Sequence, residues 1–507
     1  MDVDQLRQDV ADGTIEADRL IDLIVSQLKL IQQLQAEVEK LQAEVEKLRA
    51  EVEKLKEKNP TDRLEESFSE KAEEKRQAKA KGKRLKRKAS KRRGRLSTAE
   101  KIARATRTEL VYPNDCDPQD CKLSHTRVAW RLEDGRAVLV AYEIYRQGNR
   151  YGQPAGVPGR GEFGMEILIA LAYQVYTLGL SLDKACQVLG FFQNLSLKKS
   201  QANALLNQLA RVWEGEFDTL CMLLANAAVV YCDETGWSIN SVWAFLTDRL
   251  TVMFYGVHKD GKTLAQILDK ATFAGVLVSD DAAIYQGFSK AQKCWAHLLR
   301  KAIKLTLQAP ADTRYRELTD SLLSIYRTAK RVAKDKRFGT AGRERRVTEL
   351  EAELLALCSV HSLEGSQTEG VEDDYRRLVN EIMRLLLAKE LFVFVTTEGV
   401  VGNNNSSERE LRDDARRRDT GRTNKTPTGA KRQSIIASVL RTLGKQLSEF
   451  TLASVLAEIQ RWADRGRSCF TDQATAAGLN RASPDAEQHS LLDRIILDVD
   501  NPELAVA

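Results

Sequence analysis

The chain has 507 residues, of which 43% are hydrophobic and 30% are charged, and its net charge is +6. This length argues for several domains, and the apolar content leaves room for a real core. Eight cysteines are scattered without the spacing of a disulfide framework, which fits a reducing compartment. The acidic start of the chain lacks a signal-peptide pattern, and the longest apolar run, residues 167–182, is too short and too polar for a membrane span. We therefore expect a cytoplasmic protein without membrane contact.

A heptad repeat predicts a coiled coil over residues 18–58. The heptad Gln-Ala-Glu-Val-Glu-Lys-Leu begins at Gln35 and again at Gln42, and it recurs from Arg49 with arginine replacing glutamine. Valine falls at position a and leucine at position d, a pattern that favours parallel dimers. We expect at least a homodimer, and an antiparallel or intramolecular pairing is the alternative. The apolar seam consists of Ile24, Ile31, Leu34, Val38, Leu41, Val45, Leu48, Val52 and Leu55.

Residues 59–108 are expected to form a basic linker that binds DNA. From Lys75 to Arg95 the chain contains many lysines and arginines and no acidic residue. Such a run cannot bury a core, but it suits a phosphate backbone, with an affinity that falls steeply with salt. The alternative is a solvated linker without a specific partner. The predicted DNA contacts at its densest points are Lys86, Arg87, Lys88, Arg92 and Arg93.

Residues 109–150 predict a β-hairpin region with a degenerate zinc-finger-like motif. Asp134-Gly135 stands between two apolar runs, which is a hairpin signal. Cys116, Cys121 and His125 are close enough in sequence to suggest zinc ligands, but three ligands do not close a structural zinc site. Ordinary thiols that bind no metal are therefore the favoured interpretation.

The second half of the chain is predicted to be α/β. A helical domain over residues 151–224, with Trp213 and Phe217 in its core, precedes two short apolar runs that indicate buried strands. These runs end in Asp233 and Asp280, and a carboxylate at that end of a strand lies at the sheet edge where ligands of open α/β sheets bind.

Glu408 falls near the start of a later predicted helix. A functional role and a helix-capping role are both compatible with this position, because either Asn405 or Ser407 could begin a capping box there. Together with Asp233 and Asp280, Glu408 could hold two divalent metal ions about 3.5–4 Å apart, an arrangement that serves phosphoryl transfer.

The order of the predicted elements is that of a ribonuclease-H-like core. Three strands, a crossover helix and a fourth strand occur in sequence, and a charged helical segment separates them from the helix of Glu408. We expect the core over residues 225–304 and 398–445, an all-α insertion over residues 305–397, and a C-terminal tail over residues 446–507.

Four motifs follow one another in this half of the chain. They are Asp233-Glu234-Thr235, the segment Asp280 to Tyr285, Cys294-Trp295-Ala296-His297, and Asn404 to Arg412 with Glu408 inside it. In this order they resemble the motifs of DDE transposases of the bacterial insertion-sequence family sixty-six, and the resemblance covers roughly residues 151–443. Asp281 and Ala282 replace a glycine and a tyrosine of the second motif, so either Asp280 or Asp281 could be the second acidic ligand. The family's Cys-x-x-Cys pairs are not intact here, so zinc binding stays open.

The resemblance implies a multidomain α/β transposase: an N-terminal coiled coil, a basic linker, a helical region and a ribonuclease-H-like DDE core with an all-α insertion. It implies binding of element ends and target DNA as double strands, Mg²⁺- or Mn²⁺-dependent cleavage of 3′ ends, and strand transfer. Accessory proteins of the same element are possible partners. The implied catalytic and metal-binding residues are Asp233, Asp280 and Glu408, and the implied DNA contacts of the core are His297, Arg300, Arg409 and Arg412.

Two other classes of function remain open at this point. A metal-dependent nuclease or resolvase on the same fold would use the same three carboxylates, so only its products would distinguish it. A non-catalytic dimeric DNA-binding protein is the second alternative, and the intact carboxylates argue against it.

Overall fold

The computed structural model describes residues 12, 25–26, 29, 31–47, 97–361, 370–479 and 490–497. The chain divides into two compact units, residues 1–95 and 96–507. In the first unit, residues 31–47 form a helix, and the rest of the predicted coiled coil is largely outside the described residues, as is the whole basic run. The described helices include none that is long and apolar enough to cross a membrane. Five side chains of the predicted seam are each about half exposed on the helix of the first unit: Ile31, Leu34, Val38, Leu41 and Val45.

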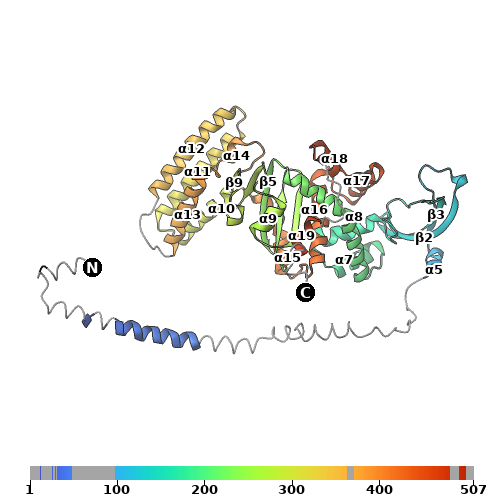
Figure 1. The fold of residues 1–507 in the computed structure, drawn as a ribbon, viewed down its shortest axis with the longest axis horizontal. Coiled ribbons are helices and arrows are strands. Elements are labelled where there is room, and N and C mark those ends of the chain that lie inside the picture. The colour runs from blue at the N-terminus through green and yellow to red at the C-terminus, as the bar shows by residue number, and fades with distance from the viewer. Residues whose placement is uncertain are drawn as a thin grey trace. The chain divides into compact units, whose positions relative to one another are not determined.

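A five-stranded mixed sheet lies at the centre of the second unit (Figure 1). Its strand order is β7-β6-β5-β8-β9, with β6 antiparallel to both neighbours and β8 parallel to β5 and β9. This mixed α/β arrangement is consistent with the predicted ribonuclease-H-like core. Every residue of β6, β7 and β8 is buried, which explains why these strands are continuous apolar runs in the sequence. The strands are β5 (Val229–Gly236), β6 (Ser241–Leu246), β7 (Thr251–Val257), β8 (Val276–Ser279) and β9 (Ala291–Lys293).

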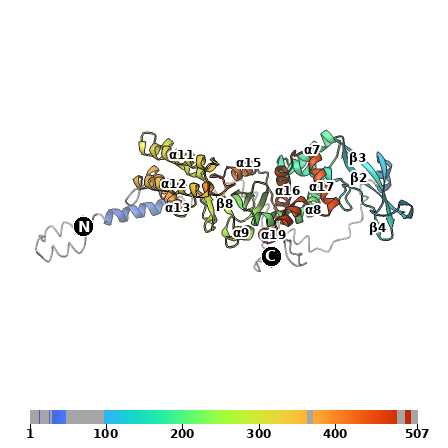
Figure 2. The same ribbon diagram turned by 90° about the horizontal axis from the view of Figure 1, so that it is seen from above.

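Helices cover both faces of this sheet (Figures 1 and 2). Alternate residues of a strand point to opposite faces. Phe245 therefore packs with Trp213 and Phe217 of α8 in one cluster, while Val242 packs with Leu411 of α15 in another. The predicted core positions of Trp213 and Phe217 are thus confirmed. The covering helices are α8 (Lys199–Ala225), α9 (Gly261–Ile267), α10 (Trp295–Gln308), α15 (Asn405–Asp419) and α16 (Pro427–Gln446).

Helix α16 also completes the hydrogen bonding of the edge strand β7. Ser434, Ser438 and Thr442 recur every fourth residue and are fully buried. The backbone N–H of Met253 donates to Ser438 Oγ at 2.9 Å, and the N–H groups of Tyr255 and Thr251 donate to Ser434 and Thr442 at 2.9 and 3.1 Å. The side chains of α16 thus accept the backbone N–H groups of β7 that a further strand would otherwise pair with, and the helix covers this edge of the sheet.

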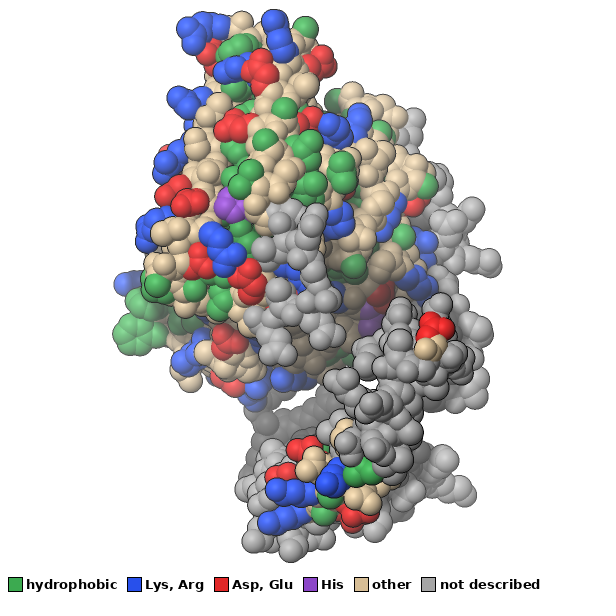
Figure 3. Space-filling view, turned by 90° about the vertical axis from the view of Figure 1, so that its left-hand side faces the viewer, with side chains coloured by type: hydrophobic (Ala, Val, Ile, Leu, Met, Phe, Trp, Pro, Cys, Tyr) green, Lys and Arg blue, Asp and Glu red, His purple; other side chains and the backbone are tan. Residues whose placement is uncertain are grey.

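The helices between α10 and α15 form an all-α layer. Their buried side chains belong to the same cluster as Val242, so the layer is continuous with one face of the sheet. On the face in Figure 3, basic and acidic side chains are interspersed over these helices, and many are paired, such as Lys301 with Glu381 and Lys389 with Glu351. The helices are α11 (Thr313–Lys334), α12 (Thr340–Val360), α13 (Val371–Leu387) and α14 (Val393–Thr396).

The remaining elements lie before and after this core. The predicted hairpin is present, and Asp134 and Gly135 both have positive φ, 47° and 75°, as a type I′ turn requires. The segment expected as a tail includes helices, and Phe470 in it is fully buried. The strands here are β1 (Arg107–Val111), β2 (Lys122–Glu133), β3 (Arg136–Gln147) and β4 (Arg150–Tyr151). The helices are α5 (Thr98–Ala103), η1 (Pro118–Asp120), α6 (Met165–Ala172), η2 (Tyr173–Thr177), α7 (Leu182–Gln193), η3 (Ala283–Tyr285), α17 (Leu452–Arg465), α18 (Cys469–Ala476) and α19 (Leu491–Leu497).

Candidate active site

Asp233 and Asp280 lie side by side at the carboxyl edge of the central sheet. Strands β5 and β8 are parallel neighbours, and Tyr231 pairs with Val278. Two residues further along this register bring Asp233 level with Asp280, which directly follows β8. The prediction of a strand end is confirmed for Asp280, but Asp233 lies inside β5, which continues to Gly236 because it pairs with β6 there. The parallel pairing of β5 with β8 brings the two aspartates together.

The electrostatics of Asp233 indicate a concentration of negative charge. Burial raises the pKa of this carboxyl group from 3.8 to about 7, and the acidic side chains of Glu234, Asp280 and Glu408 add to the rise. The backbone N–H of Glu234 donates to Asp233 Oδ1 at 3.0 Å and opposes the shift only in part. Carboxylates that repel one another in this way are stabilised by a divalent cation, so the donor set fits a metal such as Mg²⁺.

Asp280 and its neighbour Asp281 have different partners. Among the described residues, Asp280 Oδ1 accepts a hydrogen bond from the backbone N–H of Ala282 at 3.0 Å. Asp281 instead forms an ion pair with Arg384 of α13. The charge of Asp281 is therefore compensated by the helical insertion, while that of Asp280 adds to the acidic edge.

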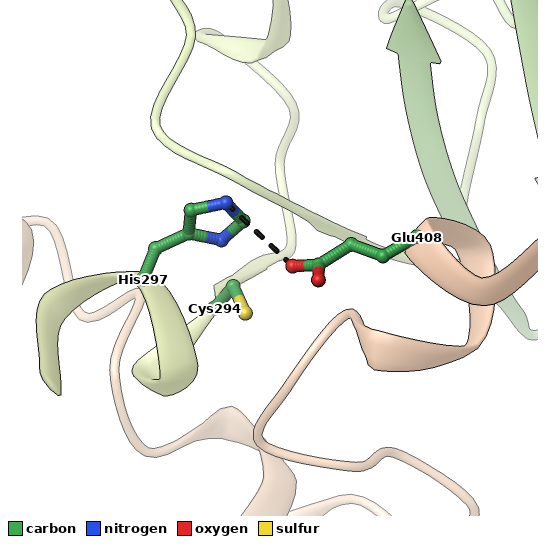
Figure 4. A group of neighbouring side chains, drawn as sticks. All are labelled: Cys294, His297 and Glu408. Carbon is green, nitrogen blue, oxygen red and sulfur yellow. Dashed lines mark ion pairs between the residues drawn. The ribbon is translucent and has the colours of Figure 1, made fainter. Parts of the chain in front are cut away.

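Glu408 enters from the first turn of α15 (Figure 4). Its two carboxylate oxygens accept hydrogen bonds from Arg300 at 2.7 and 2.8 Å, and His297 Nε2 lies 3.6 Å from Oε1. Neither predicted capping box forms: the N-cap is Asn404, and it makes no side-chain capping bond. The capping role considered for Glu408 is thus wrong, because the N-cap at Asn404 lies one residue before the N-cap of the Asn405 box and three residues before that of the Ser407 box.

Asn404 fixes the helix of Glu408 to the strand of Asp233. Its side-chain amide donates to the carbonyl oxygen of Cys232 at 2.7 Å, and its backbone N–H donates to Cys294 Sγ at 3.1 Å. Its own carbonyl accepts from Ser407 Oγ at 2.9 Å and from the N–H of Glu408 at 3.2 Å. Because Asn404 is fully buried, these bonds join β5, α10 and α15 in one rigid junction.

A buried acid next to Asp233 escaped the sequence reasoning. The side chain of Glu234 is only 2% exposed, and it pairs with Lys259 at 2.6 Å. The hydroxyl of Tyr285 donates to the other carboxylate oxygen of Glu234. The ion pair with Glu234 raises the pKa of Lys259, and Asp280 and Asp233 contribute to this rise. Lys259 is therefore a cation held beside the acidic edge.

The other predicted site residues are dispersed. Arg409 lines a cavity of about 880 Å³ together with Arg249 and Lys445, and Arg412 is exposed on α15. Cys116, Cys121 and His125 are not among the groups of described metal-ligating side chains whose ligand atoms converge within 4.8 Å. The five residues of the basic run, Lys86, Arg87, Lys88, Arg92 and Arg93, lie outside the described residues.

A mixed sheet of this order with acids clustered at its carboxyl edge is typical of metal-dependent polynucleotidyl transferases of the DDE class. The sequence pattern of the Transposase IS66 family matches residues 160–432, more than half of the chain. The chain belongs to this family and is a DDE transposase. No curated protein matches its sequence significantly.

Proposed function

We propose that this transposase binds the ends of its element, cleaves their 3′ ends with divalent metal ions, and joins them to target DNA. The observation that carries the proposal is the junction of Asp233, Asp280 and Glu408, in which strand register aligns the two aspartates and Asn404 ties the third acid to the same strand. Family membership supports the reaction class.

Asp233, Asp280 and Glu408 would hold the metal. Bound there, two Mg²⁺ or Mn²⁺ ions supply the Lewis acidity that stabilises the attacking and leaving oxygens. The protein's part is to fix the three carboxylates, and Asp280 suits the second position better than Asp281 because Arg384 already neutralises Asp281. Arg300 and His297 lie against Glu408, where they could orient a DNA phosphate near the reacting atoms.

The N-terminal unit supplies the remaining parts of the proposal. The helix over residues 31–47 leaves the seam exposed, for example Leu41 at 57% and Val45 at 48%. A single helix gains nothing from such a seam, so we infer a homodimer through a parallel coiled coil. The basic run would add affinity for the DNA backbone without reading its sequence.

The test is cleavage of DNA that carries the element's terminal inverted repeats, in the presence of Mg²⁺. Asp233→Asn, Asp280→Asn and Glu408→Gln should each lower cleavage by orders of magnitude while binding of the same DNA survives, because each keeps its shape and loses its charge. Asp281→Asn is the matched control and should cleave. Full cleavage by Asp233→Asn and Glu408→Gln would refute the proposal, and cleavage without any joined product would favour the nuclease alternative.

A further inference from the structure

Three side chains with different ligand atoms converge beside the acidic edge (Figure 4). A sulfur of Cys294, a ring nitrogen of His297 and a carboxylate oxygen of Glu408 all lie within 4.8 Å of one another. Thiolate, imidazole and carboxylate are the three ligand types that Zn²⁺ takes in proteins. We propose that these residues form a site for one thiophilic transition-metal ion of the Zn²⁺ class. This site differs from the proposed Mg²⁺ site in having sulfur and nitrogen ligands, and the two sites share Glu408.

The local backbone explains why two of the ligands share a face. Cys294 is the N-cap of α10, and His297 follows in the first turn, three residues later. Residues three apart on a helix are surface neighbours, and the N–H of His297 donates to the carbonyl of Cys294 at 3.1 Å. The short motif Cys-x-x-His thus sets both ligand atoms toward α15.

The third ligand is held in place without a metal. The N–H of Asn404 donates to Cys294 Sγ at 3.1 Å, and the N–H of Trp295 donates to the carbonyl of Gly402 at 3.0 Å. These two bonds tie the start of α10 to the loop that leads into Glu408. The backbone that carries the three ligands is therefore preorganised, and binding of an ion requires changes only in side chains.

One ring nitrogen of His297 has no hydrogen-bond partner among the described residues. Nδ1 is shielded from solvent and unpaired, while Nε2 faces Glu408 at 3.6 Å. A buried nitrogen without a hydrogen-bond partner costs free energy. Rotation of the ring that points the lone pair of Nδ1 at a bound ion removes this cost. Three protein ligands also leave a fourth position open, as in zinc sites that bind water or substrate. On binding, the Cys294 thiol would release its proton to solvent.

Arg300 is the competitor for this site. It donates to both oxygens of Glu408, at 2.7 and 2.8 Å, and its side chain is 52% exposed, so it can turn into solvent. An ion at Cys294 and His297 must take one of these oxygens. By the catalytic role proposed above for Glu408, the same ion would withdraw that carboxylate from the Mg²⁺ site and inhibit cleavage.

The test is titration of the full-length protein with Co²⁺, a spectroscopic substitute for Zn²⁺. Thiolate-bound Co²⁺ gives a ligand-to-metal charge-transfer band that oxygen-bound Co²⁺ lacks, so the readout does not depend on cleavage. We expect the band to reach its maximum at one Co²⁺ per chain. Zn²⁺ should abolish the band by displacing Co²⁺, and excess Mg²⁺ should not, because soft sulfur ligands do not select Mg²⁺. A wild-type protein without the band overturns the proposal.

Matched variants assign the band to these residues. Cys294→Ser should abolish it, and serine can still accept the N–H of Asn404. His297→Ala should weaken Co²⁺ binding by more than the roughly 10–100-fold typical of an outer ligand partner, whereas Arg300→Gln should strengthen it. Asp233→Asn, and Cys116→Ser combined with Cys121→Ser, should leave the band unchanged.

A band that persists in Cys294→Ser overturns the assignment. If that variant fails to fold, the partly exposed His297 carries the test, and unchanged Co²⁺ affinity in His297→Ala overturns it equally. Loss of cleavage in Asp233→Asn with the band retained would support both proposals separately.

Discussion

Replacing Asp233 by asparagine should stabilise the metal-free protein at alkaline pH. Burial and neighbouring acids raise the pKa of Asp233 from 3.8 to about 7. The folded state therefore holds this proton more tightly than the unfolded state, and stability falls as pH rises from about 4 to about 7. At 1.36 kcal/mol per pKa unit, the ionised carboxylate costs about 4 kcal/mol above pH 7.

The assay is thermal unfolding of wild type and Asp233→Asn at pH 5 and pH 8, in chelator and then in Mg²⁺. One kcal/mol shifts Tm by about 2–4 °C for a domain of 150–250 residues, so the variant should gain several degrees over wild type at pH 8 and much less at pH 5. Mg²⁺ should raise the Tm of wild type more at pH 8 than at pH 5, since a ligand must be deprotonated to bind. Asp281→Asn is the control, because Arg384 compensates that charge. Two results would refute the reasoning. One is a difference in Tm between wild type and Asp233→Asn that is equal at pH 5 and pH 8. The other is a metal-free wild type with a higher Tm than Asp233→Asn at pH 8.

Three further predictions concern the scaffold and the N-terminal unit. Ser438→Ala should lower the free energy of unfolding, measured in denaturant, by about 1–3 kcal/mol, because the N–H of Met253 loses its acceptor. The control is Ser359→Ala, in which an exposed serine loses only its hydrogen bond to a carbonyl of its own helix. Glutamine at all five basic-run positions should weaken binding to every DNA sequence alike and flatten the salt dependence by about 0.9 per lost phosphate contact; a loss confined to element ends in anisotropy titrations would contradict this. Leu41→Pro should lower the oligomeric state measured by light scattering, since proline costs about 3 kcal/mol inside a helix; an unchanged dimer would exclude the coiled coil as its cause.

Local signals in the sequence were sufficient for four strands of the central sheet, β5 to β8, and for two of the acids. Buried strands are continuous apolar runs, so Asp280 could be placed at a strand end, and Asp-Gly marked the hairpin. The apolar run before Asp233 showed the strand but not its end, because β5 continues through polar residues to Gly236. The three-residue strand β9 and the parallel pairing of β1 with β3 could not be predicted, because each depends on pairing with a strand that is not its neighbour in a hairpin. The serines and threonine of α16 look like ordinary polar positions until β7 is seen beside them.

The partners of the acids were less accessible to sequence reasoning. Lys259 reaches Glu234 and Arg384 reaches Asp281 from other elements, and nothing in either basic residue's neighbourhood marks it. The start of α15 was misplaced for a similar reason. The side chain of Asn404 donates to the carbonyl of Cys232 and does not cap its own helix, so the usual capping pattern does not apply.

The insertion contacts the segments that carry the second and the third acid. Arg384 of α13 pairs with Asp281, and the carbonyl of Glu390 accepts the N–H of Lys293, so the insertion contacts the segments on both sides of the second aspartate's loop. Glu408 is held instead through Asn404, whose bonds go to Cys232 of β5 and Cys294 at the start of α10. The insertion also contacts these segments, because Trp295 Nε1 donates to the carbonyl of Leu391 at 2.6 Å and Asn403 Nδ2 donates to the hydroxyl of Tyr326 at 3.4 Å. The long insertion can lie between the second and third acids in sequence because the bonds of Asn404 to Cys232 and Cys294 tie the third acid back to the strand of the first.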